Sequence, residues 1–157
     1  MKVRILKKIG MTNYRKRDVS VVFQSYNLFT YMSPLDNLLT AMAITGSQHA
    51  GDKEFAATML KKLGITEDLM RKNVQHLSGG QQQRVAIART MACDAQLVVA
   101  DEPTGNLDEN NTVEVVGLFQ KIAHEQGKCV IIVTHESAVA EMCDTTYRLE
   151  KKVFSQV

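Results

Sequence analysis

Short runs of consecutive apolar residues punctuate the chain and are separated by longer segments in which apolar residues recur at helical spacing. VSVVF at residues 19–23, LVVA at 97–100 and VIIVT at 130–134 are rich in β-branched residues and predict strands. The last two runs are apolar without interruption, a pattern typical of strands covered on both faces in a parallel sheet. TTYRLE at residues 145–150 predicts one further strand.

Four helices are predicted between the first two strands. A serine followed by proline at Ser33-Pro34 predicts a helix start, with LDNLLTAMAI behind it. A second helix is expected at 52–63, ended by Gly64. A short third helix is expected at 66–71, and a fourth at 79–93, opened by two glycines.

A long amphipathic helix is predicted at 109–126, between the two continuous apolar runs. Its buried face is expected to carry five residues: Val113, Val116, Phe119, Ile122 and Ala123. A strand, a helix and a second strand in this order predict a right-handed βαβ unit. The pattern therefore predicts an α/β fold, with a helical insert at about 25–89 between the first strand and a parallel-sheet unit.

Composition and charge narrow the class of protein only slightly. A chain of 157 residues predicts one domain, and a net charge of +2 is too weak to indicate a nucleic acid or an anionic membrane as partner. No apolar run approaches the roughly 18 residues of a membrane span. The basic stretches MKVRILKKIG and YRKR are interpreted as a surface strand and loop. Three cysteines without a CxxC spacing predict reduced thiols in a cytoplasmic protein.

Polar residues follow the predicted strands at positions where they could meet. Asp101 and Glu102 follow the second strand, His135 follows the third and Gln24 follows the first. In an open parallel sheet, ligands bind beyond the carboxyl ends of the strands. Asp101 would suit magnesium, Glu102 could polarise a water, and His135 could donate to a terminal phosphate. Taken singly, each residue could instead cap the following segment.

The segment LSGGQQQR, residues 77–84, joins a hydroxyl and two glycines to the start of a predicted helix. Ser78, Gly79 and Gly80 at such a position suit an anion, usually a phosphate. Gln81 follows them directly. The alternative is an ordinary glycine-rich helix start.

Five segments together resemble the ATP-binding cassette (ABC) ATPases. LSGGQQQR resembles the signature of that family, LVVADEP its Walker B strand, TGNLD its D-loop, VTH its switch histidine and VVFQSYNLF its Q-loop. They occur in the order of the family. The resemblance implies a P-loop NTPase core with a parallel sheet and an inserted helical subdomain. It divides the chain into a core remnant and Q-loop at 1–24, a helical subdomain at 25–89 and a Walker B to switch-histidine core at 90–157.

The resemblance also implies a role for each candidate residue. Glu102 would be the general base, Asp101 would hold Mg²⁺, Gln24 would sense metal and water, and His135 would contact the γ-phosphate of ATP. Asp108 would couple the two halves of a dimer. In the family two ATPase domains pair head to tail, so the signature residues would contact nucleotide bound by a partner; these residues are Ser78, Gly79, Gly80 and Gln81.

One family motif is absent from these 157 residues. No GxxxxGK[ST] segment occurs, and the single Gly-Lys pair, Gly127-Lys128, is interpreted as a turn between helix and strand. The expectation is therefore a chain truncated at its N-terminus that lacks the Walker A loop. The alternative to an active ATPase is a catalytically incompetent fragment that only donates its signature or acts as an interaction module.

The form EPTGNLD narrows the resemblance to ATPases of lipoprotein-release, macrolide-export and bacitracin-resistance type. This implies an ATP-hydrolysing subunit that powers export or extraction through a membrane permease, located in the cytoplasm at the inner face of the membrane. The expected partners are a second ATPase subunit and the permease, and no nucleic acid. The segment SYNLFTYMSPLDN at 25–37 either contacts the permease or packs in the core. A mechanical ATPase of DNA or the ribosome is a weaker alternative, since the net charge and TGNLD count against it.

Overall fold

Three strands form a parallel sheet at the centre of the structure. The computed structural model describes residues 10–157, and the sheet contains β1 (Val19–Phe23), β2 (Leu97–Asp101) and β3 (Cys129–Val133) in that order. The register places Phe23, Asp101 and Val133 level with one another at the carboxyl ends of the strands. The predicted parallel βαβ pairing of the second and third strands is confirmed.

The helices predicted from the sequence are present with bounds shifted by at most a few residues. They are α3 (Pro34–Thr45), α4 (Lys53–Lys62), α5 (Glu67–Met70), α6 (Gly79–Ala92) and α7 (Glu109–Gln126). Three further elements were not predicted: α2 (Met11–Arg17), the 3₁₀ turn η1 (Val74–His76) and α8 (Ser137–Glu141). The basic YRKR segment lies in α2, so the predicted surface loop is wrong there. The remainder of that prediction, residues 1–9, lies outside the described residues.

Local capping sets the ends of these helices. Ser33 caps α3, and its Oγ accepts a hydrogen bond from the Asp36 amide at 3.1 Å, with Pro34 in the first turn as predicted. Gly127 ends α7 in the left-handed conformation, with φ of 62°, which glycine adopts at little cost. The Gly127-Lys128 pair is therefore a turn between α7 and β3, as the sequence predicted.

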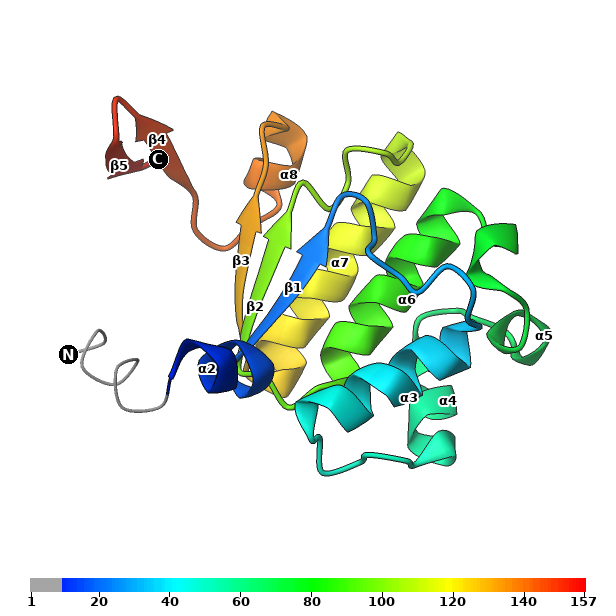
Figure 1. Ribbon diagram of the computed structural model, residues 1–157. Coiled ribbons are helices and arrows are strands. Elements are labelled where there is room, and N and C mark those ends of the chain that lie inside the picture. Colours follow the sequence, from blue (N-terminus) through cyan, green and yellow to red (C-terminus); the bar gives the residue numbers. More distant parts are fainter. Residues whose placement is uncertain (1–9) are drawn as a thin grey trace.

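The core lies between one face of the sheet and the long helices. Figure 1 shows α6 and α7 side by side on this face, with α3, α4 and α5 on the far side of α6. Val22, Val98 and Ala100 point from the strands into this layer and are fully buried. Because α6 also packs against α3 and α4, it joins the helical subdomain to the sheet. The predicted boundary at residue 89 consequently falls inside a continuous helix.

The buried face of α7 differs from the prediction by one position. Phe119 and Ile122 are buried as expected, but the Val113 side chain is 52% exposed. Thr112 and Val115 take its place in the interior. The two residues flanking Val113 are polar, so its apolar character suggested a core position. Val115 lies four residues before Phe119 and Thr112 lies three before Val115, so these two continue the helical spacing of the buried face.

The second face of the sheet is largely uncovered, and the prediction that both later strands are covered on both faces is wrong for β3. Ile131 is 47% exposed, Val133 50% and Phe23 38%, and Cys129 is exposed as well. These four residues are called the open face below. Their side chains share one side of the sheet because alternate residues of a strand point the same way and the three strands are in register.

The predicted C-terminal strand is present but does not join the parallel sheet. β4 (Tyr147–Glu150) pairs in antiparallel fashion with β5 (Val153–Gln156), a strand not predicted from the sequence. Every residue of both strands is exposed, and Figure 1 shows the hairpin projecting away from the helices. Tyr147, Leu149 and Phe154 share one apolar face of this hairpin.

Candidate functional site

The carboxyl edge of the sheet brings together two of the predicted residues. Glu102 follows β2 and His135 follows β3, and the His135 Nδ1 lies 2.8 Å from the Glu102 Oε1. The Glu102 side chain is 24% exposed, whereas that of His135 is 78% exposed. The hydrogen bond and the charge of Glu102 raise the pKa of His135 above its ordinary value. The sequence prediction that these residues converge is therefore confirmed, while their chemical roles remain predictions.

The second oxygen of Glu102 is in an unusual position. Glu102 Oε2 is buried and makes no hydrogen bond with any of the residues 10–157. A buried acceptor without a partner costs about 1–3 kcal/mol. Such a group needs an explanation, and an ordered water at this oxygen is what a general base would require.

The backbone of Glu102 is held in a conformation that a glutamate rarely adopts. Its φ is 46°, in the left-handed region. The amide of Glu102 donates to the Val133 carbonyl at 2.9 Å, and its carbonyl accepts from the Gly105 amide at 3.3 Å. These contacts hold the Glu102 backbone against the end of β3 and the loop after β2. Backbone strain of this kind costs about 1–3 kcal/mol and gathers at functional sites.

Asp101 is the last residue of β2 and lies exposed on the side of the open face. Its carboxylate makes no hydrogen bond or ion pair with another residue in the described part of the chain. Magnesium is usually held by one or two carboxylates together with phosphates and waters. A single free carboxylate fits that requirement, whereas residues 10–157 hold no group of three or more His, Cys, Asp or Glu that could bind a metal unaided.

Gln24 follows β1, but its side chain contacts the loop after β2 and not the Glu102–His135 pair. Gln24 Nε2 donates to Asn106 Oδ1 at 3.4 Å, and Asn106 Nδ2 donates to the Gln24 carbonyl at 3.1 Å. A Cβ added at Gly105 would lie 2.7 Å from Gln24 Nε2, so the Gln24 side chain passes directly over this glycine. Asn106 was not singled out in the sequence.

The LSGG segment forms the start of α6 with a complete capping box. Ser78 Oγ accepts from the Gln81 amide at 3.3 Å, and Gln81 Oε1 accepts from the Ser78 amide at 3.0 Å. Both side chains thus have a structural role in addition to the predicted binding role. The amides of Gly79 and Gly80 occupy the first two positions of the helix, where N–H groups have no partner in the helix and favour an anion.

Asp108 also has a clear structural role. It caps α7, and its carboxylate accepts from the Asn111 amide at 2.9 Å and from Asn111 Nδ2 at 2.8 Å. These hydrogen bonds lower the pKa of Asp108 below its ordinary value. The coupling across a dimer that the family resemblance implies is not tested by this geometry.

Gly80 is a position where the structure explains the residue by packing. A Cβ added to Gly80 would lie 2.5 Å from Asn111 Oδ1, and Asn111 cannot move freely because Asp108 holds it. We expect Gly80→Ala to lower the free energy of unfolding by about 1–3 kcal/mol in urea denaturation, as overpacking does.

Gly117 supplies the matched control, since it is also a helical glycine and an added Cβ would meet nothing within 4 Å. Gly117→Ala should raise the free energy of unfolding by about 0.5–1 kcal/mol through helix propensity alone. Equal effects of the two substitutions would contradict the packing explanation for Gly80.

One buried and one partly buried side chain of α6 also contact the functional loops. Gln83 is fully buried, and its Nε2 donates to the Pro103 carbonyl at 2.7 Å. Arg89 donates from Nη1 to the Asn27 carbonyl at 2.6 Å. Neither residue was predicted. An arginine within the apolar run VAIARTM is the signal that could have identified Arg89, because buried charges in such runs require partners.

The segment at 25–37, for which a permease contact and a core position were both considered, contains residues of both kinds. Tyr26, Leu28 and Leu35 are partly buried and pack against the core. Tyr31 is 74% exposed, and its ring lies 6.3 Å from that of Phe29. Tyr31 is therefore the aromatic residue of this segment that is available to a partner.

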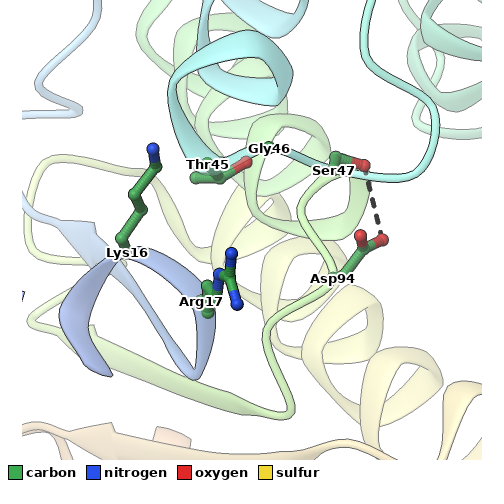
Figure 2. A pocket seen from close by; sticks show the side chains of 6 residues that line it. All are labelled: Lys16, Arg17, Thr45, Gly46, Ser47 and Asp94. Carbon is green, nitrogen blue, oxygen red and sulfur yellow. Dashed lines mark hydrogen bonds between the residues drawn. The ribbon is translucent and has the colours of Figure 1, made fainter. Parts of the chain in front are cut away.

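A shallow pocket lies at the opposite end of the sheet. Figure 2 shows its lining, which consists of Lys16, Arg17, Thr45, Gly46, Ser47 and Asp94. The Asp94 carboxylate accepts from Ser47 Oγ at 3.3 Å and from the Gln48 amide at 2.9 Å. Since Arg17 precedes β1 and Asp94 precedes β2, the pocket is at the amino ends of the strands and away from the Glu102–His135 pair.

Each helix within residues 10–157 is too short or too polar to cross a bilayer.

Comparison with known proteins gives consistent results. A family model described as ABC transporter matches residues 4–105. The chain is 51% identical over 152 residues to the uncharacterized ABC transporter ATP-binding protein YclH of Bacillus subtilis, covering 97% of this chain and 67% of that protein. It is 38% identical over 141 residues to the lipoprotein-releasing system ATP-binding protein LolD of Hyphomonas neptunium, covering 90% and 61%.

Solved structures agree with the sequence relatives. The dimeric post-hydrolysis state of the ATP-binding cassette MJ0796, bound to ADP and Pi, is similar with a TM-score of 0.75 at 32% identity. The match covers 85% of this chain and 59% of that one. The chain thus spans about three-fifths to two-thirds of the length of the relatives that it matches.

Proposed function

Since the chain belongs to the ABC transporter family of ATP-binding proteins, we propose that it carries part of the ATP-hydrolysing machinery of a transporter that exports a substrate or extracts it from a membrane. The observation that carries this proposal is the 2.8 Å contact between Glu102 and His135 at the carboxyl edge of the sheet. When bound, ATP with Mg²⁺ supplies the phosphoanhydride bond that is hydrolysed.

The residues at this edge suit that chemistry. Glu102 has one oxygen fixed by His135 and a second that is unpaired, so it can accept a proton from a water held at the second oxygen. Asp101 offers a free carboxylate as one ligand of Mg²⁺. His135 is exposed enough to donate to a phosphate. Gln24, held by Asn106, would report the state of the site to the rest of the domain.

The same proposal divides the chain into three parts with different tasks. Residues 90–157 and 1–24 would supply the catalytic edge, and residues 25–89 would contact the permease through Tyr31 and its neighbours. A second ATPase subunit would pair head to tail with this chain and hold the nucleotide that the LSGG segment contacts, which the dimeric relative supports. The protein would act at the inner face of the membrane, and nucleic acid would not be among its partners. Relatives named for lipoprotein release and macrolide export support this class of transporter.

A second candidate function follows from the LSGG segment. The 157 residues contain no GxxxxGK[ST] segment, yet Gly79 and Gly80 stand at the start of α6, where amides have no partner within the helix. In this second candidate function the chain does not hydrolyse ATP itself. It donates its signature to cover nucleotide that another ATPase subunit holds. The two candidates differ in whether the chain itself turns over ATP.

The experiment measures ATP turnover by the chain alone and its MgATP-dependent association with the complete YclH-type relative, using analytical ultracentrifugation. Turnover by the chain supports the enzymatic function. Association without turnover supports the signature donor. A folded chain that shows neither result would contradict both candidates.

A negative charge introduced at position 78 tests whether the signature contacts a phosphate. Aspartate and asparagine are both good N-cap residues, so Ser78→Asp and Ser78→Asn should each leave the free energy of unfolding within about 0.5 kcal/mol of the original. Aspartate would place a negative charge beside a phosphate. We expect Ser78→Asp to weaken the MgATP-dependent association at least tenfold more than Ser78→Asn. Equal association of the two variants would exclude a phosphate at this position.

A further inference from the structure

The turn that follows β1 has an uncommon backbone. Tyr26 and Asn27 are consecutive residues with positive φ, 61° and 46°. Asparagine tolerates the left-handed region, but a bulky aromatic residue rarely occurs there. The Tyr26 amide donates to the Phe23 carbonyl at 3.0 Å, and the Asn27 amide donates to the Ser25 carbonyl at 2.7 Å. Neither of these bonds uses the carbonyl of Tyr26 or Asn27, so both carbonyls remain free to accept from another group.

Arg89 of α6 holds both carbonyls. Its Nη1 donates to the Asn27 carbonyl at 2.6 Å and its Nη2 to the Tyr26 carbonyl at 3.2 Å. No carboxylate among residues 10–157 forms an ion pair with Arg89, and burial lowers the pKa of its guanidinium. A buried cation is costly unless its donors are used. The planar guanidinium can reach two adjacent carbonyls at once, which the single ammonium of a lysine cannot do in the same geometry.

The side chain of Tyr26 extends the contact to the other end of α6. A Cβ added at Gly79 would lie 3.0 Å from the Tyr26 hydroxyl, so the phenol rests against the first residue of the helix. Burial raises the pKa of the Tyr26 phenol, and the neighbouring Asn106 side chain opposes that shift. Asn106 in turn holds Gln24. One residue thus touches the LSGG segment, the loop after β2 and, through Asn106, Gln24.

We propose that Arg89 and Tyr26 are positioning residues that fix the 24–27 turn to α6, so that Gln24 follows the position of the LSGG segment. The proposal rests on the proposed function, in which Gln24 and the LSGG segment both serve nucleotide hydrolysis. Arg89 acts through the two backbone carbonyls and Tyr26 acts through its hydroxyl. Neither residue needs to touch nucleotide.

Amide hydrogen exchange of the purified 157-residue chain, without nucleotide, tests this arrangement. Arg89→Lys keeps the charge but loses the paired contact, so exchange at residues 25–29 should become at least tenfold faster. Exchange in β2 and in the middle of α7 should stay within threefold. Arg71→Lys, at an exposed arginine in α5's C-terminal cap, is the matched control and should change neither region.

Tyr26→Phe is the second variant, because it keeps the ring and removes only the hydroxyl. It should speed exchange at residues 79–81 and 105–107 by at least threefold while β2 stays unchanged. Unchanged exchange in both variants, or acceleration that is equal throughout the core, would overturn the proposal. The absence of nucleotide keeps this result separate from the proposed function, whose failure would leave the exchange pattern as expected here.

Discussion

Glu102→Gln is expected to lower the rate of ATP hydrolysis by about 10²–10⁴-fold, the range that general base catalysis contributes. Glutamine has the shape of glutamate, and its Oε1 can still accept from His135 Nδ1, which lies 2.8 Å from the present carboxylate oxygen. The substitution removes the basic oxygen that is now buried without a partner. The proton of an attacking water would then have no acceptor, while the backbone of residue 102 remains held by Val133 and Gly105.

The measurement is steady-state phosphate release by a preparation of this protein that hydrolyses ATP. Glu141→Gln, an exposed carboxylate in α8, is the control for loss of one negative charge and should change the rate by less than about twofold, as surface substitutions away from a site generally do. A Glu102→Gln rate within threefold of the original would show that another group takes the proton.

Phe119→Ala is expected to destabilise the fold by about 3–5 kcal/mol, the usual cost of removing a buried phenylalanine. Phe119 is 1% exposed and belongs to the cluster that joins α7 to the sheet and to α6. The stability of a whole domain is only about 5–15 kcal/mol. The variant should therefore unfold at a markedly lower urea concentration, measured by circular dichroism.

Val113→Ala on the same helix provides the comparison. Val113 is 52% exposed, so its substitution should change the free energy of unfolding by less than about 0.5 kcal/mol. The sequence pattern assigned Val113 and Phe119 to the same buried face. Similar destabilisation by both variants would restore that assignment and contradict the structure.

The elements that the sequence predicted well are those with strong local signals. The start of α3 was predicted from Ser33-Pro34, the end of α4 from Gly64 and strand β2 from the unbroken run LVVA. The structure contains all three features. α2 and β5 have no comparable local signal and were not predicted. The exposure of Val113 could not be predicted because it depends on which side of α7 meets the sheet, a property of the whole packing.

The sequence predicted which end of the sheet carries the candidate site, but not the hydrogen bonds between its residues. The order of the strands was enough to bring Glu102 and His135 to one edge. The sequence could not show that Gln24 bonds to Asn106 or that Ser78 and Gln81 cap each other, because these contacts depend on side-chain geometry. It also could not show that Arg89 holds two carbonyls 62 and 63 positions away in the chain.

The open face has a practical consequence for spectroscopy. Cys129 lies on it and is exposed, while Cys93 is buried and Cys143 is only partly accessible. A thiol-reactive fluorophore should therefore attach at residue 129 before it reaches either other cysteine. Because the dye would sit on the open face next to Ile131, its emission would respond to a polypeptide that comes to cover this side of β3. The exposed strand thus provides a natural attachment point for following assembly in real time.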